Sequence, residues 1–171
     1  MAEKLVETGV TTHKQLACRG GSNGGLLVGN AMVRRPELWG GVVCAVPLLD
    51  MRRYNKLLAG ASWMAEYGDP DTADWAFLQA YSPYHNIEPG AKYPPMLMTT
   101  STRDDRVHPY HARAFARRLE EAEACDGLLY YENIEGGHGG AADPKQQAFM
   151  MCLYILFLRK TLGAPEAERK A

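Results

Sequence analysis

Residues 18–27 read CRGGSNGGLL and place one serine, Ser22, between two pairs of glycines. Glycine loses more conformational freedom on folding than any other residue, so four glycines in six positions indicate a backbone that other residues do not readily adopt. Gly20, Ser22 and Gly24 fit the pattern G-x-S-x-G, in which a tight turn between a strand and a helix exposes a serine hydroxyl. Taken alone, the pattern also fits a flexible loop or a phosphate-binding turn.

The residues on either side of this turn favour the strand-to-helix interpretation. Residues 16–18 form a short apolar run, and residues 25–39 carry apolar side chains at helical spacing with a proline near the end. We expect side chains at positions 20 and 24 to collide with the neighbouring helix and strand, which explains both glycines. The serine would then lie at a helix N-terminus, where the N–H of Asn23 is the expected donor to a developing oxyanion.

The rest of the chain alternates between apolar strands and helices. The predicted strands cover 41–50, 93–102 and the run from 128 that ends in the glycines near 138, and the predicted helices cover 2–8, 55–87 (broken at 68–70), 108–125 and 144–162. This alternation predicts an α/β fold with about four mostly parallel strands flanked by helices. No repeat or linker divides the chain, so we expect residues 1–171 to form one domain.

Composition excludes several classes of protein. Apolar residues make up 46% of the 171 residues, charged residues 23%, and the net charge is −1, which argues against binding to nucleic acid or a membrane surface. The longest apolar run, residues 148–158, is too short to span a bilayer, and the charged N-terminus does not resemble a signal peptide. The four cysteines lie far apart, which favours reduced thiols. The sequence predicts a soluble cytoplasmic domain.

Polar residues follow the predicted strands at the edge of the sheet where function gathers in such folds. Besides Ser22 they are Asp50, the pair Asp104 and Asp105, and His138 in the loop EGGHGG. The chain order serine, aspartate, histidine is the order found in α/β-hydrolases. A neutral imidazole at position 138 would accept the serine proton and hold a carboxylate through its other nitrogen. Asp104 is the favoured carboxylate and Asp105 the alternative.

Two further patterns are better explained by structure than by function. His108 and His111 form H-x-x-H, but no third ligand has suitable spacing, so we expect no metal and no cofactor. Trp39 and Trp75 are interpreted as core aromatics.

Five motifs together resemble the catalytic domain of the prolyl oligopeptidase family of serine peptidases. They are GGSNGGLL, CAVPLLDMRRYNKLLAGASWMAEYGDP, YSPYHNI, YPPMLMTTSTRDDRVHPYHA and EGGHGG, and the similarity extends from about residue 3 to residue 163. The resemblance implies a truncated α/β-hydrolase fold in which Ser22 is the nucleophile, Asp104 completes the triad and His138 is the base.

The resemblance also implies a substrate pocket. Trp63 of the W-x-x-E/D-Y-G segment would stack on a substrate proline ring beside Tyr67, because a flat indole suits a rigid ring. Arg106 is expected to hydrogen-bond the substrate backbone, and Val107 to form a wall of the pocket. The implied substrates are short proline-containing peptides or activated and short-chain esters. The alternative is a non-catalytic fragment that keeps the fold as a scaffold, and a phosphate-binding domain is disfavoured because the Lys-Ser/Thr ending of a P-loop is missing.

By this resemblance, the chain begins only about twenty residues before the nucleophile. We therefore expect the family's propeller domain, its first sheet strands and the tyrosine that supplies a second oxyanion donor to lie outside this sequence. Exposed strand edges and apolar faces then predict a homo-oligomer. Because esters need less transition-state stabilisation than amides, ester hydrolysis is expected to survive more readily than peptide cleavage.

Overall fold

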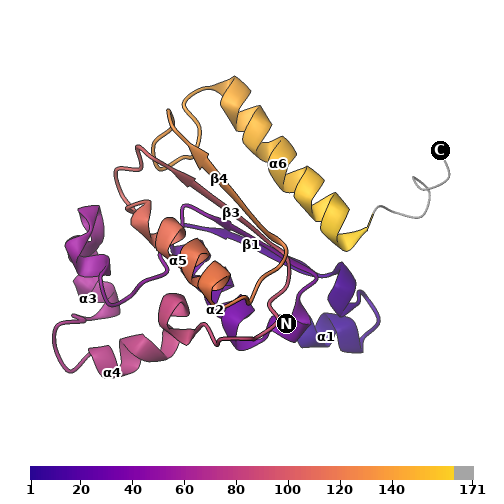
Figure 1. Ribbon diagram of the computed structural model, residues 1–171, viewed down its shortest axis with the longest axis horizontal. Coiled ribbons are helices and arrows are strands. Elements are labelled where there is room, and N and C mark those ends of the chain that lie inside the picture. The colour runs from indigo at the N-terminus through magenta and orange to yellow at the C-terminus, as the bar shows by residue number, and fades with distance from the viewer. Residues whose placement is uncertain (164–171) are drawn as a thin grey trace.

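The computed structural model describes residues 1–163, and its centre is a sheet of four parallel strands (Figure 1). The strands follow one another across the sheet in chain order: β1 (Ala17–Gly21), β2 (Gly41–Ala45), β3 (Met96–Ser101) and β4 (Leu128–Asn133). Residues 17–21 pair with 41–45, 42–45 with 96–99, and 96–101 with 128–133. This confirms the predicted α/β fold with four parallel strands.

Helices cover the two faces of the sheet unequally (Figure 1). The longer helices are α2 (Asn23–Arg34), α5 (Tyr110–Glu121) and α6 (Pro144–Leu162), and the shorter ones are α1 (Ala2–Glu7), α3 (Met64–Tyr67) and α4 (Trp75–Leu78). Helices α2 and α5 pack on one face, and α6 packs on the other. All of the strand connections therefore run through helices or helical segments, as parallel pairing requires.

The two central strands carry the core because each is buried on both faces. Val42 and Cys44 of β2 point into the cluster formed with α2 and α5, whereas Val43 lies between them in sequence and packs against α6. Every residue of β3 is buried. Continuous apolar strands of this kind are typical of parallel sheets covered on both sides.

Short 3-10 helices join the larger elements. They are His13–Gln15, Pro36–Leu38, Tyr54–Lys56, Leu58–Trp63, Gln79–Tyr81 and Pro83–Asn86. The last four belong, with α3 and α4, to the long connection between β2 and β3, where helical turns broken near residues 68–70 were predicted. This connection forms a lobe off the carboxyl-terminal end of the sheet (Figure 1).

The structure refines the predicted boundaries. Helix α6 has its predicted bounds, because the Asp143 side chain accepts the N–H of Gln146 at 2.8 Å and Pro144 occupies the first helical position. Strand β2 ends at Ala45 rather than at residue 50, because Val46 has a positive φ of 40° and Pro47 has no N–H to donate to a sheet. Helix α2 begins at Asn23, directly after the serine.

No helix among residues 1–163 combines the length and the apolar character that a bilayer crossing requires. The four cysteines, all within this range, are free thiols.

Candidate active site

Ser22 occupies a strained turn between β1 and α2. Its φ of 58° and ψ of −120° lie outside the regions that non-glycine residues favour. The surrounding backbone holds this conformation: Ser22 N–H donates to the Ala45 carbonyl at 2.9 Å, and the Ser22 carbonyl accepts the N–H of Gly25 at 2.9 Å. Strain of this kind persists only where neighbouring structure imposes it, and it is concentrated at functional sites.

The glycines around Ser22 have unequal roles. A Cβ at position 20 would lie 2.1 Å from the Gly24 carbonyl oxygen, so only glycine fits there. A Cβ at position 24 would meet nothing within 4 Å, so the expected collision at that position is wrong. The tight contact lies one residue later, where a Cβ on Gly25 would come within 2.6 Å of Pro47. The turn therefore needs glycine before the serine, and α2 needs glycine where it crosses the segment after β2.

His138 and Asp104 meet at the carboxyl ends of β4 and β3. His138 Nδ1 lies 2.8 Å from Asp104 Oδ2 and 3.0 Å from Oδ1. The Asp104 side chain is fully buried, whereas that of His138 is 17% exposed. The carboxylate therefore faces one ring nitrogen from the protein interior. Of the two neighbouring aspartates, Asp104 faces the histidine and Asp105 is exposed.

Backbone hydrogen bonds fix the Asp104 carboxylate in place. Its Oδ1 accepts the N–H groups of Arg106 and Val107, both at 2.9 Å. Because two donors and the imidazole all converge on one buried group, the loop after β3 presents the carboxylate in a single orientation.

The glycine-rich loop after β4 is equally well anchored. Asn133 Oδ1 accepts the N–H groups of Glu135 and Gly136 at 2.8 Å, and the Ser101 hydroxyl donates to the Gly136 carbonyl. A Cβ on Gly136 would lie 2.7 Å from the Ala141 nitrogen, and Gly140 has a φ of 76°. These two positions require glycine, and the loop they shape carries His138.

The Ser22 hydroxyl makes no hydrogen bond to His138 or to any other of the residues 1–163. In unliganded sites, hydrogen bonds between a nucleophile and its base are often long and tighten when substrate binds. The structure thus brings Asp104 and His138 together, and it places Ser22 at the same edge of the sheet.

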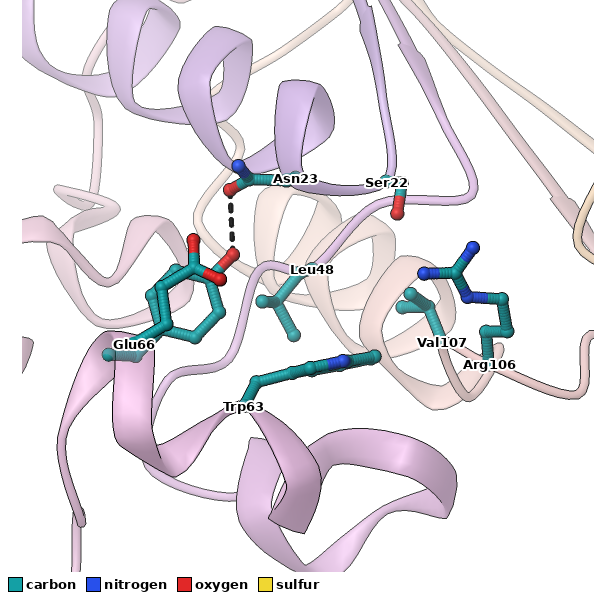
Figure 2. Close-up of a pocket in the computed structure, with 8 residues that line it drawn as sticks. Ser22, Asn23, Leu48, Trp63, Glu66, Arg106 and Val107 are labelled. Carbon is teal, nitrogen blue, oxygen red and sulfur yellow. Dashed lines mark hydrogen bonds between the residues drawn. The ribbon is translucent and has the colours of Figure 1, made fainter.

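A cavity of about 120 Å³ opens beside Ser22 (Figure 2). The residues that line it are Ser22, Asn23, Leu48, Trp63, Glu66, Tyr67, Arg106 and Val107. In Figure 2 the indole of Trp63 forms the floor, Ser22 lies above it, and Arg106 and Val107 stand at one end. All of the substrate-binding residues named from the sequence therefore lie around one cavity.

A hydrogen bond joins the lobe to the turn that carries Ser22. Tyr67 Oη donates to Asn23 Oδ1 at 2.7 Å, shown by the dashed line in Figure 2. Burial raises the pKa of the Tyr67 hydroxyl, and the charge of Glu66 raises it further, so the donor proton is retained. The Asn23 N–H is the first of α2, where an amide has no carbonyl of its own helix to bond.

Sequence reasoning missed two of the lining residues, Leu48 and Glu66. Glu66 had a usable signal: it lies three residues after Trp63 and one before Tyr67 in a helical segment, and residues three or four apart share a helix face. Leu48 had no such signal, because the predicted strand ran to residue 50 whereas β2 ends at Ala45, before Leu48.

A second serine, histidine and aspartate also lie close together, away from the cavity. Ser82 Oγ lies 2.8 Å from His85 Nδ1, and that same nitrogen is 3.9 Å from Asp50 Oδ1. Ser82 and Asp50 are fully buried, and one ring nitrogen faces both groups. In a catalytic triad the histidine contacts the serine through one ring nitrogen and the carboxylate through the other. Here a single nitrogen faces both groups, so this cluster is structural.

The H-x-x-H pair is likewise occupied within the fold. His111 Nδ1 accepts the Asp50 N–H at 3.1 Å, and His108 Nδ1 accepts the Tyr110 N–H at 3.0 Å. No group of three or more histidine, cysteine, aspartate or glutamate side chains suited to a metal ion occurs within residues 1–163. Trp39 and Trp75, predicted as core aromatics, are half-buried and pack against the apolar clusters.

Comparison of the sequence with known proteins identifies the family of this chain. The model of the peptidase S9 prolyl oligopeptidase family matches residues 1–164. The chain belongs to the prolyl oligopeptidase family. An uncharacterized peptidase, y4nA, of Sinorhizobium fredii is 47% identical over 165 residues, which is 95% of this chain and 22% of that protein. A prolyl endopeptidase of Elizabethkingia meningoseptica is 39% identical over 147 residues, or 84% of this chain and 21% of that protein.

Solved structures of prolyl oligopeptidase relatives agree with the fold. A prolyl endopeptidase, from a study of inter-domain dynamics in catalysis and specificity, has a TM-score of 0.88 at 45% identity and covers 96% of this chain and 24% of its own. Oligopeptidase B from Trypanosoma brucei, with covalently bound antipain, has a TM-score of 0.91 at 28% identity and covers 96% and 24%. The chain thus has the fold of the α/β-hydrolase catalytic domain of these peptidases and spans about a fifth of the length of its curated relatives.

Proposed function

We propose that this chain carries a serine-hydrolase site that acts through an acyl-enzyme on Ser22. The observation that supports it most directly is the hydrogen bond between the His138 ring and the buried Asp104 carboxylate, 2.8 Å long, at the sheet edge that also holds Ser22. The family is one of serine peptidases, and the substrates we propose are peptides cleaved after proline, or activated and short-chain esters.

The first step uses each of the three side chains once. Asp104 accepts the Nδ1–H of His138, which leaves Nε2 without a proton and free to act as a base. Nε2 takes the Ser22 proton as Oγ attacks the substrate carbonyl carbon. The carbonyl π electrons move to oxygen, and the Asn23 N–H donates to that oxyanion.

The second and third steps return the proton and release the products. The tetrahedral intermediate collapses, the bond to the leaving nitrogen or oxygen breaks, and the His138 imidazolium gives its proton to the leaving group. Water then attacks the acyl-enzyme with His138 as base, and the acid product leaves with Ser22 restored. Metal and cofactor have no part in this proposal.

The cavity supplies the selectivity for proline in this proposal. The half-buried Trp63 presents an indole face as the floor, and Leu48 and Val107 add apolar walls. A pyrrolidine ring lying on the indole gains dispersion energy and loses little conformational freedom, since the ring is already rigid. Arg106 would donate to the substrate backbone at the end of the cavity nearer Ser22.

Active-site labelling tests the proposal. A fluorophosphonate probe phosphonylates an activated serine, so mass spectrometry of the parent chain should show one adduct on Ser22 and none in Ser22→Ala. Ser82→Ala is the matched control, because that serine also lies beside a histidine but is buried. No adduct on the parent, with the protein folded, would favour the alternative of a non-catalytic scaffold.

Ester hydrolysis is proposed to exceed peptide cleavage in this chain. Asn23 is the one backbone oxyanion donor we assign within residues 1–163, and loss of one donor costs roughly 100- to 1000-fold in rate. A short-chain nitrophenyl ester and a proline-containing anilide, compared side by side, would separate the two activities.

We also propose that the chain forms homo-oligomers. Strands β1 and β4 end the sheet, and α6 exposes Phe149, Ile155 and Leu156. Open edges and exposed apolar side chains favour association with a second copy. Light scattering at micromolar concentration should show a dimer or larger species, and a monodisperse monomer would contradict this.

A reducing, cytoplasmic compartment is proposed from the cysteines. Cys44 is buried, and burial raises the pKa of the Cys18 thiol to about 12. Such thiols are protonated and unreactive at neutral pH, which suits a protein that needs no disulfide.

A further inference from the structure

The turn after Ser22 contains a pair of residues that is open to a spontaneous chemical change. Asn23 is followed by Gly24, and no other asparagine in the sequence precedes a glycine. In deamidation, the backbone nitrogen of the following residue attacks the side-chain amide carbon of asparagine. Glycine favours this attack, because it has no Cβ to obstruct it and adopts backbone angles that other residues avoid. Asn23 is therefore the asparagine of this chain with the neighbour best suited to the reaction.

The two nitrogens that take part in this reaction make no hydrogen bonds in the folded protein. Within residues 1–163, the Gly24 N–H has no acceptor and the Asn23 side-chain nitrogen, Nδ2, has no partner. The first N–H groups of a helix have no carbonyl in a preceding turn, and Gly24 is the second residue of α2. Asn23 is exposed to water, and a Cβ on Gly24 would meet nothing within 4 Å. Neither the attacking nitrogen nor the leaving group is therefore held back by a partner of its own.

One hydrogen bond opposes the reaction. Tyr67 Oη donates to Asn23 Oδ1 at 2.7 Å, as the dashed line in Figure 2 shows. Tyr67 belongs to α3 in the lobe, so the Asn23 amide cannot turn toward Gly24 without breaking a bond between two separate elements. A donor on Oδ1 also makes the amide carbon more electrophilic. Because burial raises the pKa of Tyr67, its hydroxyl is a weak acid, and this activation is the smaller of the two effects.

We propose that Asn23 is a site of spontaneous deamidation and that the hydrogen bond from Tyr67 slows the reaction. The Gly24 nitrogen bonds to Asn23 Cγ, the Cγ–Nδ2 bond breaks, and ammonia leaves with the proton of the Gly24 amide. Water then opens the resulting succinimide ring at either carbonyl. One product is aspartate at position 23, and the other is isoaspartate, in which Gly24 is bonded through Cγ. Nothing is oxidised or reduced, and water is the only reactant added.

Either product alters the proposed oxyanion site. The Asn23 N–H is the donor assigned to the oxyanion, and an aspartate at this position puts a second negative charge beside the developing one. Isoaspartate adds one carbon to the main chain between Asn23 Cα and Gly24, at the start of α2. We therefore expect the reaction to inactivate the site with time. This consequence rests on the proposed hydrolase function, whereas the deamidation itself does not.

Peptide mapping by mass spectrometry measures the reaction. The parent chain and Tyr67→Phe are incubated at mildly alkaline pH, both folded and unfolded in guanidinium chloride. The mass of the peptide that carries Asn23 increases when oxygen replaces the amide nitrogen. In the folded state, Tyr67→Phe should deamidate roughly two- to tenfold faster than the parent, the factor that corresponds to one hydrogen bond of ordinary strength. In guanidinium chloride, where that bond is absent, the two chains should react at the same rate.

Gly24→Ala is the control for the chemistry. Its methyl group obstructs the attacking nitrogen, and the fold has room for it at this position. The variant should deamidate at Asn23 more slowly than the parent, both folded and in guanidinium chloride. If Asn23 keeps its amide in the folded parent and in folded Tyr67→Phe while the unfolded parent reacts, the site is overturned. If folded Tyr67→Phe reacts no faster than the folded parent, the protective role of Tyr67 is overturned.

Fluorophosphonate labelling separates this inference from the proposed function. Asn23→Asp reproduces the aspartate product, and its Ser22 should label roughly tenfold more slowly than that of the parent, because like charges meet at the oxyanion. Absence of labelling in the parent refutes the hydrolase function and leaves the mass measurement of deamidation unaffected. Labelling of Asn23→Asp at the parent's rate refutes the loss of activity alone.

Discussion

The buried imidazole of His111 should make the chain lose stability in mild acid. His111 is 1% exposed, and its Nδ1 accepts the backbone N–H groups of Leu49 at 3.4 Å and Asp50 at 3.1 Å. Both donors require that nitrogen to be without a proton. The pKa of His111 is lowered from 6.5 to about 4, mainly by burial; the charge of Asp50 opposes this shift, and neighbouring His108 adds to it.

The sign and size of the effect follow from linkage between proton binding and folding. Between pH 6.5 and pH 4 the unfolded chain binds a proton at position 111 and the folded chain does not, so the free energy of unfolding falls as the pH falls. A gap of about 2.5 pH units, at about 1.4 kcal/mol each, amounts to about 3 kcal/mol. The stabilisation is complete above pH 6.5 and is lost progressively down to pH 4.

Urea denaturation at several pH values measures this loss. We compare the parent with His111→Gln, in which the amide oxygen can still accept a backbone N–H but does not titrate. The parent should lose about 3 kcal/mol more than the variant between pH 7 and pH 4. His85, whose pKa is also lowered by burial, contributes equally to both proteins and cancels.

Exposed His13 provides the control. His13→Gln should keep the pH dependence of the parent. Equal slopes for the parent and His111→Gln would refute the reasoning, as would an imidazole NMR titration that places the folded-state pKa of His111 near 6.5.

Two further predictions concern the turn and the Asp104 carboxylate. Gly20→Ala should destabilise the chain by roughly 1–3 kcal/mol or more, because its methyl group would overlap the Gly24 carbonyl. Gly24→Ala should be neutral or stabilising by up to about 1 kcal/mol, because a Cβ at that position meets no other atom within 4 Å. Equal urea midpoints for the two variants would contradict this difference in packing. Asp104→Asn should keep the fold and reduce the fluorophosphonate labelling rate of Ser22 by about 1000-fold or more, because His138 would lose the partner that fixes its tautomer; labelling at the parent's rate would remove Asp104 from the site.

The parts of the fold that were predictable are those that depend on local patterns. Helix α6 has its predicted bounds because Asp143, Pro144 and Gly163 mark its ends within a few residues of sequence. The continuous apolar runs of β2 and β3 likewise indicated buried parallel strands. Local chemistry decides such elements, so no knowledge of distant residues is needed.

The features that were missed depend on contacts between distant segments. Gly25 is required because α2 crosses Pro47 there and leaves no room for a Cβ. No residue near position 25 in the sequence indicates that contact. His111 bonds to residues 61 and 62 positions away, so its H-x-x-H spacing alone did not reveal that its ring accepts these backbone N–H groups. Glu66 was recognisable from its spacing to Trp63, but its exposure and lack of a partner became visible only in three dimensions.

The proposed catalytic residues and the cavity all come from one uninterrupted part of the chain, residues 22–138. Every residue proposed to act on substrate, and every wall of the cavity, lies within that one stretch. Transplanting residues 22–138 into a full-length relative would therefore exchange the proposed nucleophile, carboxylate, base and pocket together, while leaving the remainder of the host protein untouched. A chimera of this kind would show whether substrate preference depends on residues 22–138 or on the rest of the host protein.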